Sequence, residues 1–451
     1  MASIDPALTA QQLAAAYTQG MQSQLTSQKT AAQQTATALN TLKTALSTFD
    51  TALSSLSTSS GLRKFTTSAS SSVATATANS KAQPGTYSFY VEQLASANQI
   101  VFEDLPAVPV ALGGPLTVQL ADGSTFNVDL LAADTDNDGS ISQSEIARAI
   151  NRAEDNAGKV TASVVTAGGS TQLLLSSNAT GAGGAITLDT SGLAAGALKD
   201  ALDAGRELVP AKDAIVWLGG QGGVKLQQDS NVFTSIEGVT ITFTQAMSAS
   251  DPPVTLTVAD DADGTADSVQ KFVDAYNALE KSLDSLTQFG NPDAGTQSAV
   301  FASDAGVRAL RSKLSSILRQ DFGGLTLVDL GVKANRDGSL SLDRTKLQKT
   351  LATQPDALET VFGKASLSAG SGVLDAMSDY VNSWTNSSTG QIAARQNSVQ
   401  IQQKSITDRQ ARLDAQYNAV YQRYLMQFTQ LQTLQEQMSQ TSNLFSTVAT
   451  N

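Results

Sequence analysis

The sequence contains no cysteine and no histidine among its 451 residues, and aromatic residues make up only 5% of it. Without thiols the chain can form no disulfide, thiol nucleophile or cysteine-based zinc site. Without imidazole it lacks the commonest general base and the commonest ligand of transition metals. These absences disfavour catalysis, so we expect a protein that is not an enzyme and requires no cofactor.

Basic charge is also scarce, since 29 Lys and Arg stand against 41 Asp and Glu and give a net charge of −12. No Lys/Arg stripe is present to displace counterions from phosphate, which disfavours a nucleic-acid partner. The longest apolar runs fall far short of the ~20 residues needed to span a bilayer, so we expect no membrane insertion. The opening residues MASIDPALTA lack the regions of a cleaved signal peptide. We expect either a cytoplasmic protein or one exported without such a signal.

What the chain does contain is a seven-residue apolar repeat at each end. Near the N-terminus the two positions of the repeat are Leu25, Ala32, Leu39, Leu46 and Leu53, and Met21, Gln28, Thr35, Leu42, Phe49 and Leu56. This 3-4 spacing predicts a coiled-coil seam. The outer half of the seam is the weaker half, because Gln and Thr stand there in place of Leu.

The C-terminal end carries the same pattern, interrupted by Gln396, Gln403, Gln410 and Gln427. Its apolar positions are Ile392, Val399, Ile406, Leu413, Val420 and Leu434, and Tyr417, Tyr424, Leu431 and Met438. A helix over 391–440 would be roughly 75 Å long and must pair with another helix to bury its stripe. The N-terminal helix is the expected partner.

Two interpretations of this helix pair stay open at this point. The pair can be an autonomous antiparallel coiled coil that serves as a scaffold. Alternatively, its polar seam leaves it marginal alone, and neighbouring subunits complete the core. Under either interpretation we expect a leg whose seam comprises Leu39, Leu42, Leu46, Phe49, Leu413, Tyr417, Val420, Tyr424 and Leu431.

The middle of the chain alternates apolar and polar residues as β-strands do, for example in GTYSFYVEQLA and again in GVTITFTQ. A separable unit lies between these segments, and apolar spacing of 3.6 residues returns after Asp267. We therefore predict an α+β multidomain fold. Its parts are a coiled-coil leg (1–45 with 391–451), a helical bundle (46–75 with 267–390), an inner β domain (76–107 with 209–266) and an outer α+β domain inserted in it (108–208).

One segment of the outer domain, DTDNDGSISQSE, has the ligand spacing of a calcium-binding EF-hand loop. The candidate ligands are Asp134, Asp136, Asp138, the Ser140 carbonyl, Ser142 and Glu145. The segment lacks an entering helix and a paired second loop, so a calcium sensor is disfavoured. We predict a structural calcium site here. The alternative is a plain turn without calcium. A capping box that joins Ser142 to Glu145 is a further role of that glutamate, and it does not exclude calcium because it uses the same local geometry.

Five segments resemble the flagellar hook-associated protein 2 family, the bacterial flagellar filament cap proteins. They are QPGTYSFYVEQLASANQ, EGVTITFTQ, FVDAYNALEKSLDSL, LVDLGVKANRDGSLSLD and RQARLDAQYNAVYQRYLMQFTQLQTLQEQMSQTSNLF. They follow the family's order, and the resemblance covers nearly the whole chain. One departure is the start, SIDPALTAQQLAAAYTQG, where many members have a Gly/Ser/Leu-rich stretch.

The resemblance implies a homo-oligomeric ring at the distal tip of the extracellular flagellum. Such a ring helps exported flagellin subunits to fold and insert, without catalysis. The terminal helices would act as legs, and the β domains as a plate. Export would use the flagellar type III apparatus and an export chaperone, with no cleaved signal peptide.

Two other functions remain as alternatives. Another axial protein, such as flagellin or a hook–filament junction protein, would share the heptad ends and the β-rich middle. A surface adhesin would use a calcium-binding outer domain to hold its ligand. A finite ring distinguishes a cap from flagellin, which polymerises without limit, whereas adhesion can coexist with capping.

Overall fold

The computed structural model describes residues 5–57, 61–363 and 372–448. The chain forms two compact units, one built from Met1–Leu62 with Thr265–Asn451 and the other from Arg63–Gly264. We call them the helical unit and the β unit. Among the described residues, no helix is both long enough and apolar enough to cross a membrane.

The helical unit is built around the two long terminal helices. Its helices are α1 (Pro6–Leu56), α4 (Ala262–Thr287), α5 (Ala305–Ile317), α6 (Arg344–Thr353), α7 (Ala357–Phe362), α8 (Val373–Thr385) and α9 (Gln391–Val448). A short turn of 3₁₀ helix (Pro292–Ala294) and a hairpin of β18 (Val332–Ala334) and β19 (Leu340–Leu342) complete it. Asp5 caps α1, since its carboxylate accepts the N–H groups of Ala7 and Leu8.

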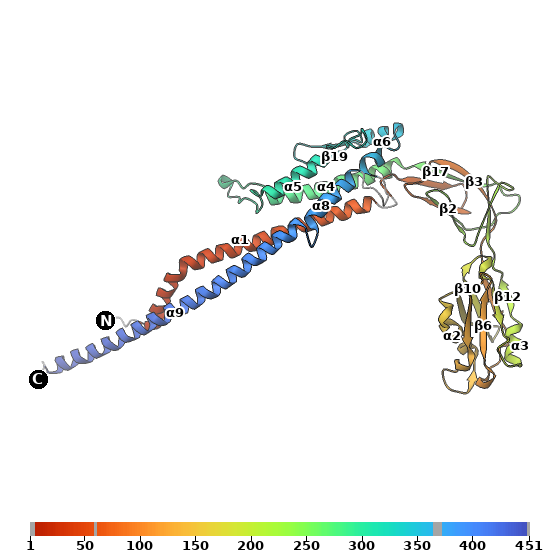
Figure 1. The fold of residues 1–451 in the computed structure, drawn as a ribbon, viewed down its shortest axis with the longest axis horizontal. Helices are drawn as coiled ribbons and strands as arrows, with labels where there is room; N and C mark the ends of the chain where they lie inside the picture. Colours follow the sequence, from red (N-terminus) through yellow and green to blue (C-terminus); the bar gives the residue numbers. More distant parts are fainter. Residues whose placement is uncertain (1–4, 58–60, 364–371, 449–451) are drawn as a thin grey trace. The chain divides into compact units, whose positions relative to one another are not determined.

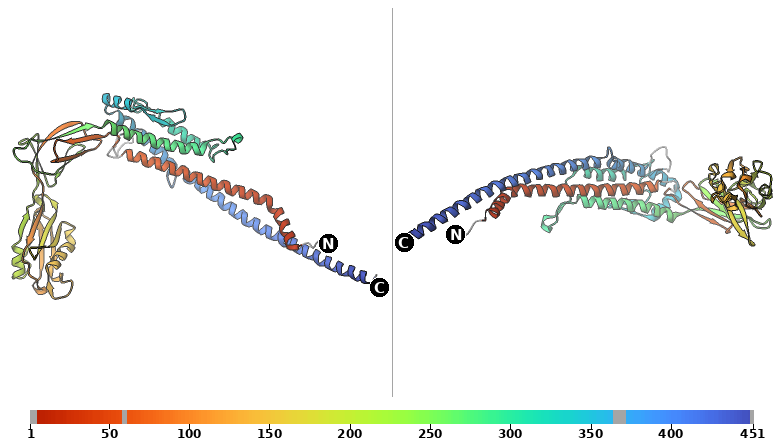
Figure 2. Two further views of the ribbon diagram at one scale, coloured as in Figure 1. Left: turned by 180° about the vertical axis from the view of Figure 1, so that it is seen from behind. Right: turned by 90° about the horizontal axis from the view of Figure 1, so that it is seen from below.

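Helices α1 and α9 lie side by side and run in opposite directions, and the end of α9 continues beyond the start of α1 (Figures 1 and 2). Both bury residues at heptad spacing. On α1 these include Thr18, Leu25, Ala32, Leu39, Leu46 and Leu53, and on α9 Ile392, Val399, Ile406, Leu413 and Val420. The predicted pair of long terminal helices is therefore confirmed.

The core of the helical unit joins the inner end of this pair to the smaller helices. Phe49 of α1 packs edge-on against Tyr276 of α4, with ring centroids 6.2 Å apart, and Phe272 packs likewise against Phe362 at 5.2 Å. Apolar residues of α5, α8 and the hairpin belong to the same buried cluster. Burial of this kind stabilises by about 25 cal/mol per Å² of apolar surface, so the helices depend on one another.

The inner part of the β unit is a pair of antiparallel sheets. The first has the strand order β1 (Phe65–Ala69), β17 (Val254–Asp260), β3 (Gly85–Gln93), β13 (Ala214–Leu218) and β14 (Val224–Gln228). The second has the order β15 (Val232–Ile236), β16 (Val239–Phe243) and β2 (Ala74–Ala78). The buried rings of Phe89, Phe233 and Phe243 meet edge to face at 5.3–5.5 Å within the shared core.

The outer part of the β unit has its own core between two further antiparallel sheets. One sheet has the order β12 (Arg206–Val209), β4 (Ala97–Phe102), β10 (Ser170–Thr180) and β9 (Val160–Ala167). The other has the order β11 (Ile186–Asp189), β6 (Pro115–Leu120) and β7 (Thr125–Asp129). Helices α2 (Gln143–Arg152) and α3 (Ala197–Asp203), four 3₁₀ turns (110–112, 130–132, 154–156, 182–184) and the short pair β5 (Val108–Pro109) and β8 (Ser140–Ile141) complete it.

Two predicted domain boundaries differ from the structure. Residues 65–69 and 74–75, expected in the helical bundle, belong to strands β1 and β2 of the β unit. The outer sheet includes β4, which lies between β12 and β10, so the outer domain begins near residue 97 instead of 108. Strand β7 ends at Asp129, because the Asp129 carboxylate accepts the Leu131 N–H and turns the chain. The place of β4 in the outer sheet could not be predicted, because the alternation of residues along a strand does not identify the neighbouring strands.

Replacing Leu46 by Gln should destabilise the helical unit by about 2–4 kcal/mol, because this fully buried side chain would leave both a cavity and an unpaired amide. Fluorescence of Trp384, which lies in the same core, measures unfolding in denaturant in a Trp217→Phe background. The matched control is Met21→Gln, at a seam position that is 40% exposed, where little change is expected. Unchanged stability of the Leu46→Gln variant would contradict the packing described here.

Candidate functional site: the terminal leg and the acidic loop

The predicted leg seam divides into an inner and an outer part. Leu39, Leu42, Leu46 and Phe49 are all buried in the core of the helical unit, together with Ile392 and Val399 of α9. These inner residues hold the base of the leg to the bundle. A separate small cluster of Leu25, Ala32, Ile406 and Leu413 continues the seam outward.

The seam side chains of α9 become more exposed toward its C-terminal end. Leu413 and Val420 are buried, Tyr417 and Tyr424 are half-buried, and Leu431 is 41% exposed. The next apolar positions, Leu434 and Met438, are also exposed. The seam residues predicted from the heptads are therefore buried only as far as Val420, Tyr424 is half-buried, and the seam positions from Leu431 to Met438 face solvent in the part of the chain that the structure describes.

Polar side chains bridge the two helices where the seam lacks leucine. Gln22 and Gln410 exchange two hydrogen bonds, of 3.3 and 2.8 Å, and Gln396 donates to Asn40 Oδ1 at 2.8 Å. Polar pairs in a coiled coil specify register at a cost in stability. Two of the four glutamines that interrupt the repeat, Gln396 and Gln410, thus help to fix how α9 lies on α1, and such polar pairs stabilise less than leucine layers would.

The base of the leg carries an ion pair that the sequence patterns did not indicate. Arg395 of α9 forms two hydrogen bonds, of 2.7 and 3.2 Å, to the carboxylate of Asp304, which also caps α5. Its guanidinium stacks 5.4 Å from the ring centroid of buried Trp384. These contacts hold α9 on α5 and α8. They join residues that are far apart in the sequence, so no local motif indicates them.

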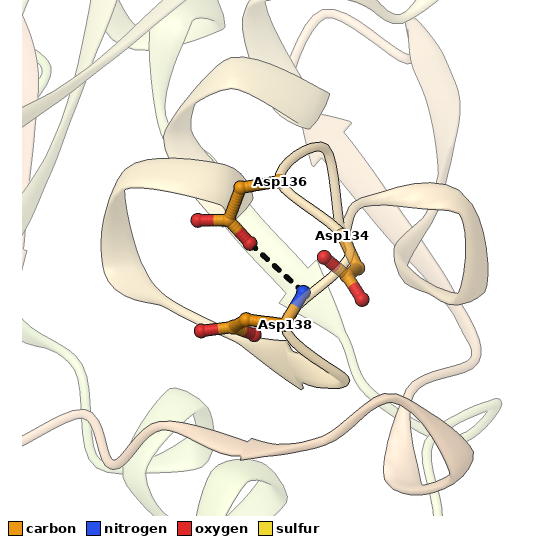
Figure 3. Close-up of side chains that lie close together, drawn as sticks. All are labelled: Asp134, Asp136 and Asp138. Carbon is orange, nitrogen blue, oxygen red and sulfur yellow. Dashed lines mark hydrogen bonds between the residues drawn. The ribbon is translucent and has the colours of Figure 1, made fainter.

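In the acidic loop the structure gathers three of the six predicted calcium ligands. Carboxylate oxygens of Asp134, Asp136 and Asp138 lie within 4.8 Å of one another (Figure 3). The Asp138 N–H donates to Asp136 Oδ1 at 3.2 Å, and the Gly139 N–H donates to Asp134 Oδ2 at 3.0 Å. Gly139 has a φ of +84°, which permits the sharp turn. The loop is thus held by bonds from its own backbone to its carboxylates.

Glu145 forms part of the expected capping box. The N–H and hydroxyl of Ser142 donate to its Oε2 at 2.9 and 2.8 Å, and the Thr135 N–H donates to Oε1 at 2.8 Å. The side chain is only 1% exposed. These hydrogen bonds, that from the Ser142 backbone first, lower the pKa of Glu145 to about 2.

The structure thus shows Glu145 in the capping box, and its role as a metal ligand stays a prediction. Both of its oxygens are engaged, and it lies outside the group formed by the three aspartates. Ser140 of β8 pairs with Pro109 of β5, and Ser142 is the N-cap of α2. Three carboxylates fall short of the 6–8 oxygen ligands that calcium usually takes. Calcium binding stays a prediction, now on fewer ligands, which calorimetric titration of the intact chain would decide.

Comparison with known proteins shows matches along most of the chain. The C-terminal part of flagellar hook-associated protein 2 matches residues 211–440, and its N-terminal part matches residues 2–98. The lateral flagellar hook-associated protein 2 of Vibrio parahaemolyticus is 35% identical over 82% of this chain and 83% of its own length. The B-type protein of Pseudomonas aeruginosa is 27% identical over 81% of this chain and 78% of its own.

A solved structure is similar over most of the fold. The D1-D2-D3 domains of the flagellar cap protein FliD from Escherichia coli match with a TM-score of 0.65 and 26% identity. The match covers 80% of this chain and 99% of that one. The likeness therefore extends over both the helical and the β-rich parts.

Glu145→Gln should destabilise the outer domain by about 1–3 kcal/mol, because an amide cannot accept hydrogen bonds on both sides as the carboxylate does. Denaturant unfolding followed by circular dichroism measures it. The control is Asp136→Asn, on an exposed carboxylate that accepts one long bond of 3.2 Å.

The same carboxylate predicts a pH dependence. Its folded-state pKa, about 2, lies below the ordinary 4.5, so its stabilisation is complete above about pH 4.5 and is lost as pH falls toward 2. The Glu145→Gln variant should lack this contribution. An identical acid dependence in the two proteins would contradict the assignment.

Proposed function

The chain belongs to the flagellar hook-associated protein 2 family, and on that premise we propose that it forms a homo-oligomeric cap at the distal end of the flagellar filament. There it promotes the folding and insertion of exported flagellin subunits and carries out no catalysis. The observation that carries this proposal is the leg, whose apolar seam residues are buried at its base and exposed at the outer end of α9.

The geometry of the leg fits a part that engages other subunits. Apolar residues at the end of α9, such as Leu431, Leu434 and Met438, lie exposed at heptad spacing. Exposed apolar positions in phase are surfaces that another helix can cover. In the proposed cap, neighbouring filament subunits supply that cover, and the weak outer seam lets the leg adapt to them as the filament grows.

The β unit supplies a body that does not need the leg to fold. Its two cores are distinct from that of the helical unit, and every sheet within them is antiparallel. In the proposed cap these domains form the plate over the filament end. Antiparallel sheets with their own cores suit this role, because they keep their shape while the legs move.

The proposed partners are further copies of this chain, flagellin, the flagellar type III export apparatus and an export chaperone. The absence of cysteine from the whole sequence supports export in an unfolded form, since no disulfide can form to resist unfolding. The proposed location is the extracellular tip of the filament. Family membership disfavours flagellin itself as the identity, and adhesion by the outer domain remains an untested addition to capping.

Truncation after Gln400 should leave a folded protein that still forms rings but cannot support filament growth. The shortened chain keeps Ile392 and Val399, which belong to the main core, and loses Ile406 and Leu413, which hold the outer leg. Filament growth is measured as the motility of a strain that lacks the gene for this protein and carries the variant. Ring formation is measured as the mass of the purified variant.

Detection of the truncated protein in the culture medium controls for failed export. A second control is removal of residues after Met438 only, which keeps the whole covered seam. Motility restored by the chain truncated after Gln400, at normal export, would contradict the role given to the leg.

A further inference from the structure

A hollow of about 570 Å³ opens on the surface of the helical unit between α4, α5 and the turn of the β18–β19 hairpin. Arg308 of α5 and Arg336 of the turn line it from two different elements. Tyr276 and Glu280 of α4 line it as well and are themselves buried. Its lining includes no residue of the acidic loop or of the outer leg, and only Tyr276, through Phe49, touches the base of the seam, so neither of those sites accounts for the hollow.

Buried contacts hold the hollow in shape. Arg311 Nε donates to Glu280 Oε1 at 2.6 Å, and its Nη1 lies 3.4 Å from Asp284 Oδ1, so this guanidinium is already neutralised. The hairpin turn presses on the same glutamate, because a Cβ at Gly338 would collide with Glu280 Oε1. Asn277 fixes the hairpin through two hydrogen bonds to the Leu340 backbone, of 2.6 and 2.9 Å. A site fixed in advance loses little entropy on binding.

Two arginines of the hollow are left without a charge partner. Arg308 and Arg336 are exposed, and neither forms an ion pair within the described ranges of the chain. The nearby Asp337 carboxylate is engaged by the N–H and hydroxyl of Ser339. Phe289, 67% exposed, stands at the same hollow. Arginine and exposed aromatic side chains are the residues enriched where proteins bind one another.

The segment that surrounds the hollow, residues 305–353, carries an excess of basic charge. Residues 305–353 contain nine Lys or Arg and four Asp or Glu, in a chain whose net charge is −12. The β unit, residues 63–264, contains 10 basic and 22 acidic residues and so carries the whole net charge. The helical unit is balanced overall, which makes its basic segment a local feature. The lining of the hollow holds three basic and three acidic side chains, so the basic excess comes from the surrounding segment, and the acidic β unit of another copy is the electrostatic complement of that segment.

We propose that this hollow docks an acidic segment of the β unit of a neighbouring copy, with Arg308 and Arg336 pairing its carboxylates and Phe289 covering its apolar edge. The proposal rests on the proposed cap function. Because two different surfaces meet, the contact is heterologous, and repetition of such a contact closes into a ring when the rotation between copies permits. Such a contact is steered by charge, so salt weakens it.

Mass measurement of the purified full-length chain at micromolar concentration tests the proposal. The wild type should form a finite oligomer of its 46.8 kDa chain, and raising NaCl from about 50 to about 500 mM should dissociate it. Arg308→Glu/Arg336→Glu should raise the dissociation constant about tenfold or more, whereas Phe289→Ala should raise it without changing the salt dependence. Circular dichroism confirms that each variant is folded.

The matched control is Lys271→Glu/Lys281→Glu, which reverses two exposed charges of the same unit outside the hollow. It should assemble as the wild type does. Assembly of the arginine variant at wild-type affinity would overturn this inference while the cap proposal stands. Loss of filament growth by an arginine variant that still forms rings would indicate that the hollow binds flagellin, and it would also overturn this inference. A wild type that never forms a finite oligomer would refute the cap proposal itself.

Discussion

The apolar seam between α1 and α9 joins the two ends of the chain, and every other element is inserted between them. Forming this seam closes a very long loop, so its cost in chain entropy must be met by the burial that it permits. That burial is concentrated at the base, where Phe49 meets Tyr276 and Val399 joins the same core. The helical unit therefore requires the inner parts of both terminal helices, and the leg extends outward from the core that they complete.

The seam weakens with distance from this base, and the proposed function depends on that gradient. Leucine layers give way to a small cluster around Leu25 and Ile406, beside which Gln22 and Gln410 pair, and then to residues that are exposed. A uniformly apolar seam would make a rigid rod that needs no partner. A seam this polar is held in register but is weakly stabilised, which suits a leg that must release and bind again at a growing filament end.

Local sequence patterns predicted the helices and turns that depend on residues close together in the chain. The heptads located both terminal helices, and the spacing of Asp134, Asp136 and Asp138 located a compact acidic turn. Contacts between distant residues were not predictable in this way. The sheet that includes β4, the Arg395–Asp304 pair and the hollow around Arg308 all join segments that sequence periodicity treats separately. Glu145 shows a different limit, because one spacing fits both an EF-hand and a capping box, and only the positions of its hydrogen-bond donors separate them.

Native-state hydrogen exchange of the intact, unassembled chain tests the seam gradient most directly. Amides of α1 near Leu46 and of α9 near Val399 should exchange only through global unfolding of the helical unit. Those near Thr18 and beyond Val420 should exchange far faster, by local opening of the outer leg. Uniform protection along both helices would contradict the account, since it would make the pair an autonomous coiled coil that needs no neighbouring subunit.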